Sequence, residues 1–177
     1  NWDSGTVYPA GTSFKGMHGD VDLKAKWETA KFDLTFSYES GPVTVVYSYK
    51  DALTIDNPTK NGYIFGGWKV VAAPDSNTTW VIGDVHNVGI ASGKVTIPAN
   101  QLGAATFEPI WTADTYTITF ISNGGAGVDS ITYKITDSFT LPATTKKGYV
   151  LAGWDMTENV NGNWTKSTYA LNEALSG

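Results

Sequence analysis

The sequence predicts a mainly β protein (β-rich α+β) built from small units in tandem. Three observations support this prediction: a segment of 18 residues occurs twice, apolar and polar residues alternate in short runs, and glycine and aromatic residues are abundant. Glycine accounts for 19 of the 177 residues, and 13% of the chain is aromatic. This composition is typical of short strands joined by tight turns.

The repeated segment sets the organisation of the chain. Residues 51–68 read DALTIDNPTKNGYIFGGW and residues 137–154 read DSFTLPATTKKGYVLAGW, with eight of the 18 positions identical at an offset of 86. In both copies a Gly-Tyr step predicts a turn into a strand. A Gly-Trp step follows, whose glycine indicates a bulge or a close backbone approach. We expect Trp68 and Trp154 to anchor small cores.

Alternating runs that end in tryptophan place the boundaries between units. Residues 22–27 and 106–111 alternate in the same way, and their tryptophans are 84 residues apart. A new alternating run begins shortly after each, at Lys31 and at Thr115. Because each tryptophan is followed by a new opening strand, we expect a unit to end just after it.

The chain is therefore expected to contain three parts. Residues 1–28 form the C-terminal tail of a preceding repeat, residues 29–112 a complete repeat, and residues 113–177 a second repeat that lacks its closing strand. A loose apolar stripe over residues 167–175 predicts one or two helical turns near the end of the second repeat.

Charge and composition exclude several classes of function. The formal net charge is −5 with no basic stripe, which argues against a nucleic-acid partner. No stretch approaches the roughly 20 apolar residues of a membrane span. The chain has no cysteine, so it can form neither a disulfide framework nor a thiolate metal site.

Several motifs, taken in order, carry a resemblance to a known family. The second repeat contains Asn-Gly-Gly, Thr-Leu-Pro and Lys-Lys-Gly-Tyr-Val-Leu-Ala-Gly-Trp, and the N-terminal tail contains Leu-Lys-Ala-Lys-Trp. This order resembles the Listeria–Bacteroides repeat, also known as the internalin B-repeat, over essentially the whole chain. The middle repeat departs from the pattern, because residues 37–41 replace the Asn-Gly-Gly turn and a longer stretch precedes Trp111.

The resemblance implies both a fold and a role. It implies tandem small β-grasp, ubiquitin-like repeat units in an extracellular bacterial protein, secreted or on the cell surface, with no enzymatic activity and no cofactor. The role it implies is a stalk or spacer in adhesion, with neighbouring repeats of the same protein and host proteins or glycans as partners. The alternative is a carbohydrate-binding accessory module of a secreted polysaccharide-degrading enzyme. Such a module presents two or three coplanar aromatic rings on one face, whereas a spacer buries nearly all of them.

Individual residues offer few candidates for a site. The two histidines, His18 and His86, lie near no patterned serine or acid, and no acidic spacing matches a calcium loop, so the sequence predicts no catalytic or metal site. Trp2, Trp80 and Trp164 lie in variable stretches beside polar residues, where an exposed ring could stack on a sugar. The alternative is that each tryptophan covers the open end of its own small core.

A final expectation concerns pairing between molecules. The second repeat lacks a counterpart of residues 21–27, and the N-terminal tail carries that strand without the rest of its repeat. Because an unpaired sheet edge is a template for another strand, we expect head-to-tail strand exchange through residues 21–27.

Overall fold

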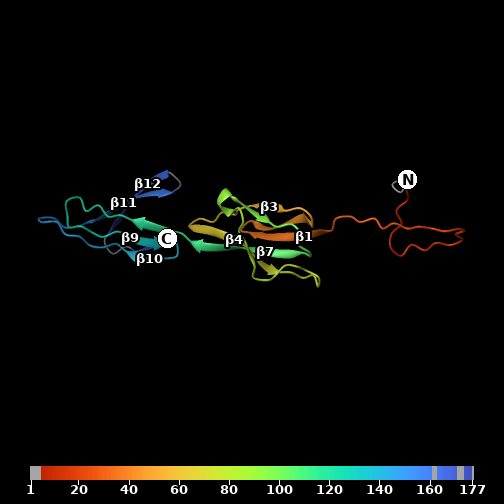
Figure 1. Cartoon of the computed structure of the whole chain (residues 1–177). Coiled ribbons are helices and arrows are strands. Elements are labelled where there is room, and N and C mark those ends of the chain that lie inside the picture. The colour runs from red at the N-terminus through yellow and green to blue at the C-terminus, as the bar shows by residue number, and fades with distance from the viewer. Residues whose placement is uncertain (1–4, 161–162, 171–173, 177) are drawn as a thin grey trace.

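The computed structural model describes residues 5–160, 163–170 and 174–176, with side chains described through residue 157. Strands dominate this part of the chain (Figure 1). Its one helical segment is the 3₁₀ helix η1 (Ile90–Ser92). The prediction of a mainly β protein is therefore confirmed, whereas the described residues contain no α-helix that would justify the α+β class.

The middle unit is built around a five-stranded mixed sheet in the order β2-β1-β7-β4-β5. β1 and β7 are parallel neighbours, the other neighbours are antiparallel, and β3 pairs with β6 in a separate two-stranded sheet. The strands are β1 (Lys31–Tyr38), β2 (Gly41–Ser48), β3 (Leu53–Asp56), β4 (Tyr63–Ala72), β5 (Val85–His86), β6 (Lys94–Ile97) and β7 (Ala105–Ala113).

Alternation along these strands produces the core. In β1 the inward positions Leu34 and Phe36 are fully buried, and in β7 Phe107 is fully buried as well. The β3–β6 pair contributes Val95 and Ile97 to the same cluster. One face of the large sheet is thus covered by the β3–β6 pair, as period-two patterning requires.

Trp68 lies at the centre of this core and confirms the expected anchor. Its side chain is fully buried, and its ring meets Phe36, Tyr38 and Phe65 edge-on at centroid distances of 5.0, 5.1 and 5.4 Å. Edge-to-face contacts at these distances are the favoured geometry for aromatic rings. The tryptophan therefore ties β1 to β4 across the intervening β7.

The glycine before Trp68 is explained by a bulge. The register between β4 and β7 shifts between Phe65 and Gly67. Gly67 has a φ of +127°, and a Cβ atom there would lie 2.8 Å from the carbonyl oxygen of His86. Only glycine fits such a position, so the predicted bulge and close approach are both confirmed.

The second unit is less continuous. Its strands form three separate antiparallel pairs, β8–β9, β10–β13 and β11–β12. The strands are β8 (Thr115–Ile118), β9 (Ile131–Lys134), β10 (Ser138–Thr140), β11 (Gly153–Val160), β12 (Asn163–Ala170) and β13 (Ala174–Ser176).

The helical turns predicted over residues 167–175 are wrong for residues 167–170 and 174–175, and residues 171–173 lie outside the described part. β12 pairs with β11 at eight consecutive positions, and β13 pairs with β10. Residues 164–169 read Trp-Thr-Lys-Ser-Thr-Tyr, and the threonine and aromatic residues among them favour a strand. Long-range pairing therefore outweighs a loose apolar stripe.

The two copies of the repeated segment share one local structure. The backbone N–H of Tyr63 donates to the carbonyl of Lys60 at 3.1 Å, and that of Tyr149 donates to the carbonyl of Lys146 at 3.0 Å. In each copy the lysine amine lies over the tyrosine ring, 4.8 Å from the centroid in the first and 4.7 Å in the second. The sequence repeat is thus also a structural repeat.

The described part of the N-terminal tail contains no strand. Residues 22–27, expected to form one, run unpaired, and the side chains of Leu23 and Trp27 are 74% and 89% exposed. Both edges of β1 are already occupied, by β2 and by β7. The tail therefore does not pair with β1, the strand that directly follows it, and it runs as an extended trace beyond the middle unit (Figure 1).

Candidate functional site

The three tryptophans predicted as ligand-stacking candidates have different positions. Trp80 is only 5% exposed, and its Nε1 donates a hydrogen bond to the carbonyl oxygen of Gly103 at 2.9 Å. Its ring contacts Tyr47, His86 and Phe107 at centroid distances of 6.3, 5.5 and 5.3 Å. Trp80 thus belongs to the core, which is the alternative that the sequence left open.

The structure describes the other two candidates only in part or not at all. Trp2 is outside the described residues. The backbone of Trp164 lies in β12 opposite Asn159, and its side chain is outside the described part. Stacking of a sugar on Trp2 or Trp164 stays a prediction.

Exposed aromatic rings in the described part of the chain are spread over the N-terminal tail and the second unit. The most buried rings are those of Phe36, Tyr47, Trp68 and Phe107, whereas the large exposed rings are those of Tyr8, Phe14, Trp27, Tyr116 and Tyr149. Tyr8 and Phe14 contact each other, but edge-on, with 75° between their planes. A sugar-binding face needs rings that are coplanar, and this pair is not.

The two histidines have different surroundings. His18 is exposed in the tail, and His86 lies half-buried against Trp80 and Phe107. Burial lowers the pKa of His86 below its usual 6.5, and the nearby carboxylate of Asp84 only partly opposes this shift. Within residues 5–160, 163–170 and 174–176, no three histidine or acidic side chains are grouped to hold a metal ion.

The lowered pKa of His86 predicts that acid destabilises the middle unit. Near pH 6.5 the unfolded chain binds more protons than the folded one, so the free energy of unfolding falls as the pH drops through 6.5 towards the folded-state pKa. Urea unfolding at pH about 7.5 and about 5.5 measures this difference. His86→Phe should reduce the difference. A pH dependence in His86→Phe equal to that of the parent chain contradicts the assignment.

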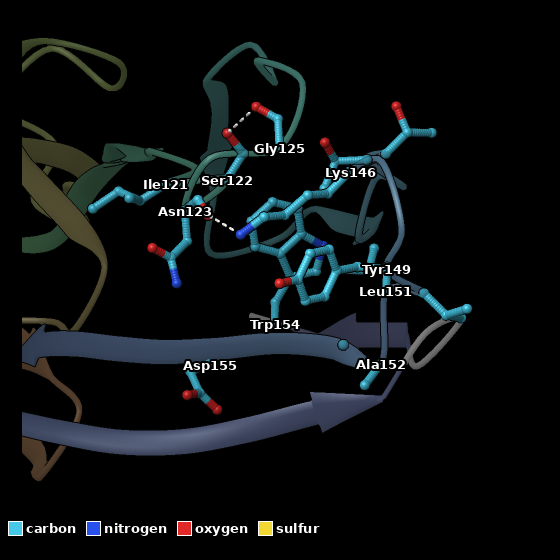
Figure 2. Close-up of a pocket in the computed structure, with 14 residues that line it drawn as sticks. Ile121, Ser122, Asn123, Gly125, Lys146, Tyr149, Leu151, Ala152, Trp154 and Asp155 are labelled. Carbon is cyan, nitrogen blue, oxygen red and sulfur yellow. Dashed lines mark hydrogen bonds between the residues drawn. The ribbon is translucent and has the colours of Figure 1, made fainter.

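A groove of about 760 Å³ lies in the second unit (Figure 2). Two segments line it: residues 121–125, which follow β8, and residues 144–155, which lead into β11. Ser122 begins a tight turn that Gly125 closes, with the N–H of Gly125 donating to the carbonyl of Ser122 at 3.0 Å. The groove therefore separates the opening strand of the unit from the Gly-Trp strand.

The lining of the groove is partly aromatic and partly polar. The amine of Lys146 donates to the carbonyl of Asn123 at 3.0 Å, which joins the two segments. Trp154 is partly buried, its Nε1 donates to the carbonyl of Pro142 at 2.8 Å, and its ring lies 5.1 Å from that of Phe120. Asp155 is the sole carboxylate among the described lining residues. The described lining therefore contains no pair of carboxylates of the kind that glycoside hydrolysis uses.

Sequence reasoning did not select Tyr149 or Trp154 as site residues. Both belong to the repeated segment, whose first copy packs into the core of the middle unit. The signal that could have found them is the difference in pairing: in the middle unit Tyr63 and Trp68 pair with β7, and in the second unit no described strand pairs with Tyr149 or Trp154 from that side.

Comparison with known families decides which kind of repeat this is. The model of the Listeria-Bacteroides repeat domain matches residues 32–88 and again residues 116–175, which together make up more than half of the chain. The chain belongs to the Listeria–Bacteroides repeat family. The two matches begin inside β1 and β8, so each starts in the opening strand of its unit. The groove lies entirely within the second Listeria–Bacteroides match.

Two relatives come from Evansella cellulosilytica. One, named "Putative Gly-rich membrane protein", is 27% identical over 185 residues, covering 97% of this chain and 20% of its own length. The other, named "Putative membrane protein", is 27% identical over 161 residues, covering 88% of this chain and 22% of its own. The Listeria–Bacteroides segment thus spans about one fifth of these relatives. No solved structure matches the chain.

The names of these relatives raise the question of a membrane-crossing segment. Among the described residues, no helix has the length and apolarity needed to cross a bilayer.

Proposed function

We propose that this chain is a non-catalytic spacer segment of a bacterial cell-surface or secreted protein, in which two β-grasp units support an adhesive function. The observation that carries the proposal is the direct join between the units. β7 ends at Ala113 and β8 begins at Thr115, so Asp114 alone connects them. A connection of one residue transmits the position of one unit to the next.

Contacts on either side of the join support a fixed arrangement. The N–H of Asp114 donates to the carbonyl of Gly62 at 2.8 Å, and the N–H of Thr115 donates to the Asp114 carboxylate at 2.7 Å. Gly62 also lies against Ile135 of the second unit, since a Cβ atom on Gly62 would be only 2.5 Å from the Ile135 Cδ1. The middle unit therefore contacts the second unit through both backbone and side-chain atoms.

The topology of the middle unit favours a β-grasp assignment. Its sheet holds a central parallel pair, β1 and β7, flanked by antiparallel neighbours in the order β2-β1-β7-β4-β5. In the β-grasp arrangement the first and last long strands lie side by side in this way. The connection from β2 to β4 runs over the core face through β3, where a helix would lie in ubiquitin-like units.

Charge and relatives favour an envelope location. A net charge of −5 gives neighbouring copies of the chain a mutual repulsion that limits their aggregation in a crowded array. The two relatives carry membrane-protein names, which supports a place in the cell envelope. We propose that the segment lies on the outer side, where it holds an adhesive domain away from the cell.

Carbohydrate binding is the less well supported alternative, because burial of Trp80 removes one of the three candidate stacking rings. Calorimetry with a panel of oligosaccharides tests it on Trp164→Ala and on the parent chain. Saturable binding that is lost in Trp164→Ala would favour an accessory module over a spacer.

The spacer role is tested by measuring the distance between the units. Because the chain has no cysteine, spin labels can be placed at Lys50→Cys and Lys147→Cys, which are exposed in different units. We expect a narrow distance distribution that broadens when Gly-Ser-Gly-Ser is inserted between Ala113 and Asp114. The same insertion between Gly127 and Val128 is the control and should leave the distribution narrow. A distribution that is already broad in the parent chain would overturn the spacer proposal.

A further inference from the structure

The middle unit shows what a closing strand contributes. β7 lies between β1 and β4, pairing in parallel with β1 at residues 105–107 and antiparallel with β4 over residues 106–113. Phe107 is fully buried and stacks on Phe36 with a centroid distance of 4.7 Å and 10° between the rings. The strand thus supplies both backbone partners and a central core residue.

The groove of the second unit occupies the position where such a strand would lie. β8 pairs with β9 and β11 pairs with β12, and no described ladder joins β8 to β11. Residues 149–155 line the groove. At the offset of 86 they correspond to residues 63–69, which are the positions of β4 that pair with β7. The groove is therefore bounded on one side by the counterparts of the β4 residues that pair with β7, and on the other side by residues 121–125, which follow β8.

The N-terminal tail carries a segment of the matching pattern. Residues 21–27 correspond to residues 105–111 of β7 at the offset of 84, and both end in tryptophan. Val21, Leu23 and Trp27 occur at alternate positions and are 52%, 74% and 89% exposed. Large apolar side chains exposed along one segment are typical of an interaction site. Both edges of the adjacent β1 are taken, so β1 is not the partner of this segment.

We propose that the groove of one molecule binds residues 21–27 of a second copy of this chain as an added strand, parallel to β8 and antiparallel to β11. This is β-strand addition, in which main-chain hydrogen bonds supply affinity and alternate side chains supply specificity. The proposal does not depend on the spacer role, because it concerns pairing between molecules and not the join within one.

The pairing of β7 fixes the register of the added strand. Phe36 lies beside Phe107 in the parallel pair, so Leu23 is placed beside Phe120. Phe120 already lies 5.1 Å from Trp154, as Phe36 lies 5.0 Å from Trp68. Leu23 would thus cover an aromatic pair that Phe107 covers in the middle unit.

The same register brings a further apolar pair together. Phe65 lies opposite Trp111 with their rings 5.5 Å apart, which places Leu151 opposite Trp27. The tryptophan that is 89% exposed in the tail would then lie against an apolar side chain.

Charge supports this register. In the middle unit Lys69 of β4 lies opposite Glu108 of β7, a pair of opposite charges. The corresponding pair across the groove is Asp155 and Lys24, again opposite in charge but with the signs exchanged between the two strands. Opposite charges directly across two strands stabilise the pairing, and like charges destabilise it.

Head-to-tail addition makes an open assembly. The donating and accepting surfaces lie on different parts of the chain, so each added molecule leaves a new groove or a new tail for the next. Trp27 precedes the first residue of β1 by the same four positions that separate Trp111 from the first residue of β8. Successive molecules would therefore follow one another with the spacing of successive units within one chain.

Site-specific disulfide formation tests the register. Lys24→Cys and Asp155→Cys are prepared as separate single-cysteine chains, mixed at high concentration and oxidised. We expect a disulfide-linked heterodimer, because directly paired residues lie within the Cα–Cα range of about 4.4–6.8 Å that a disulfide requires. Lys15→Cys, in the same exposed tail but outside the added strand, replaces Lys24→Cys in the control. Equal yields of heterodimer from the two mixtures would overturn the proposal.

Sedimentation of the intact chain over a range of concentrations tests the association itself. We expect dimers and longer oligomers that Leu23→Asp weakens roughly ten- to a hundredfold, as loss of a buried leucine contact predicts. Val7→Asp removes another exposed apolar side chain of the tail and should not weaken association. A strict monomer at the highest concentration, or equal weakening by both substitutions, would overturn the proposal. A peptide of residues 19–30 should also compete with any oligosaccharide that binds in the groove. Binding of both at once would overturn the proposal.

Discussion

Replacing Trp68 with alanine is expected to destabilise the middle unit by about 3–5 kcal/mol, the range found when a fully buried large aromatic side chain is truncated. The ring has no exposed surface and contacts Phe36, Tyr38 and Phe65 at once. Its loss leaves a cavity at the centre of the core, which the surrounding strands cannot close without breaking their register. Chemical unfolding followed by far-ultraviolet circular dichroism measures the effect.

Trp154→Ala is the matched control, because it changes the same position of the second repeat. Trp154 is only partly buried and lies beside the groove, so its loss opens space that is already accessible to solvent. We expect a clearly smaller destabilisation. If both substitutions have the same cost, Trp68 is not the centre of the middle core.

Gly62→Ala is expected to cost about 2–5 kcal/mol, from two separate causes. Gly62 has a φ of +74°, which costs an alanine about 1–2 kcal/mol. The new methyl group would also lie 2.5 Å from the Cδ1 and 2.9 Å from the Cβ of Ile135, and overpacking of this kind adds about 1–3 kcal/mol. The second cause acts only if the two units touch as described.

Gly148→Ala separates the two causes. Gly148 has a similar φ of +81°, but a Cβ atom there meets nothing within 4 Å. Measured at low protein concentration, it should therefore show the backbone cost alone. The difference between the two variants reports the contact between the units, and no difference would mean that Ile135 does not rest on Gly62. Ile135→Ala should relieve the additional cost of Gly62→Ala and leave Gly148→Ala unchanged.

The repeat and its local structure could be predicted from the sequence because they depend on neighbouring residues. The Gly-Tyr turn, the bulge before Trp68 and the opening strand at residue 31 each follow from a short pattern of glycine, aromatic and alternating residues. The presence of two copies strengthened the prediction, because an accidental match over 18 residues would not preserve the same alternation of apolar and polar residues.

Features that depend on distant partners could not be predicted in this way. Trp80 lies in a variable stretch beside polar residues, and its place in the core is fixed by Tyr47 and by the carbonyl of Gly103, which come from other segments. The strand that contains Trp154 begins only at Gly153, whereas its counterpart begins at Tyr63. Residues 150–152 have strand-forming sequence but lack the neighbour that β7 provides in the middle unit, and a pattern does not show whether its neighbour is present.

The parallel pairing of β1 with β7 has a mechanical consequence. The chain enters the middle unit through β1 at Lys31 and leaves it through β7 at Ala113. When tension is applied along the chain, the two adjacent strands are pulled in opposite directions along their length. The hydrogen bonds between them then share the load in shear, and they cannot open one after another as they do when a hairpin is peeled apart. The middle unit is therefore connected in the way that best resists being pulled open, a property that a tether under flow would need.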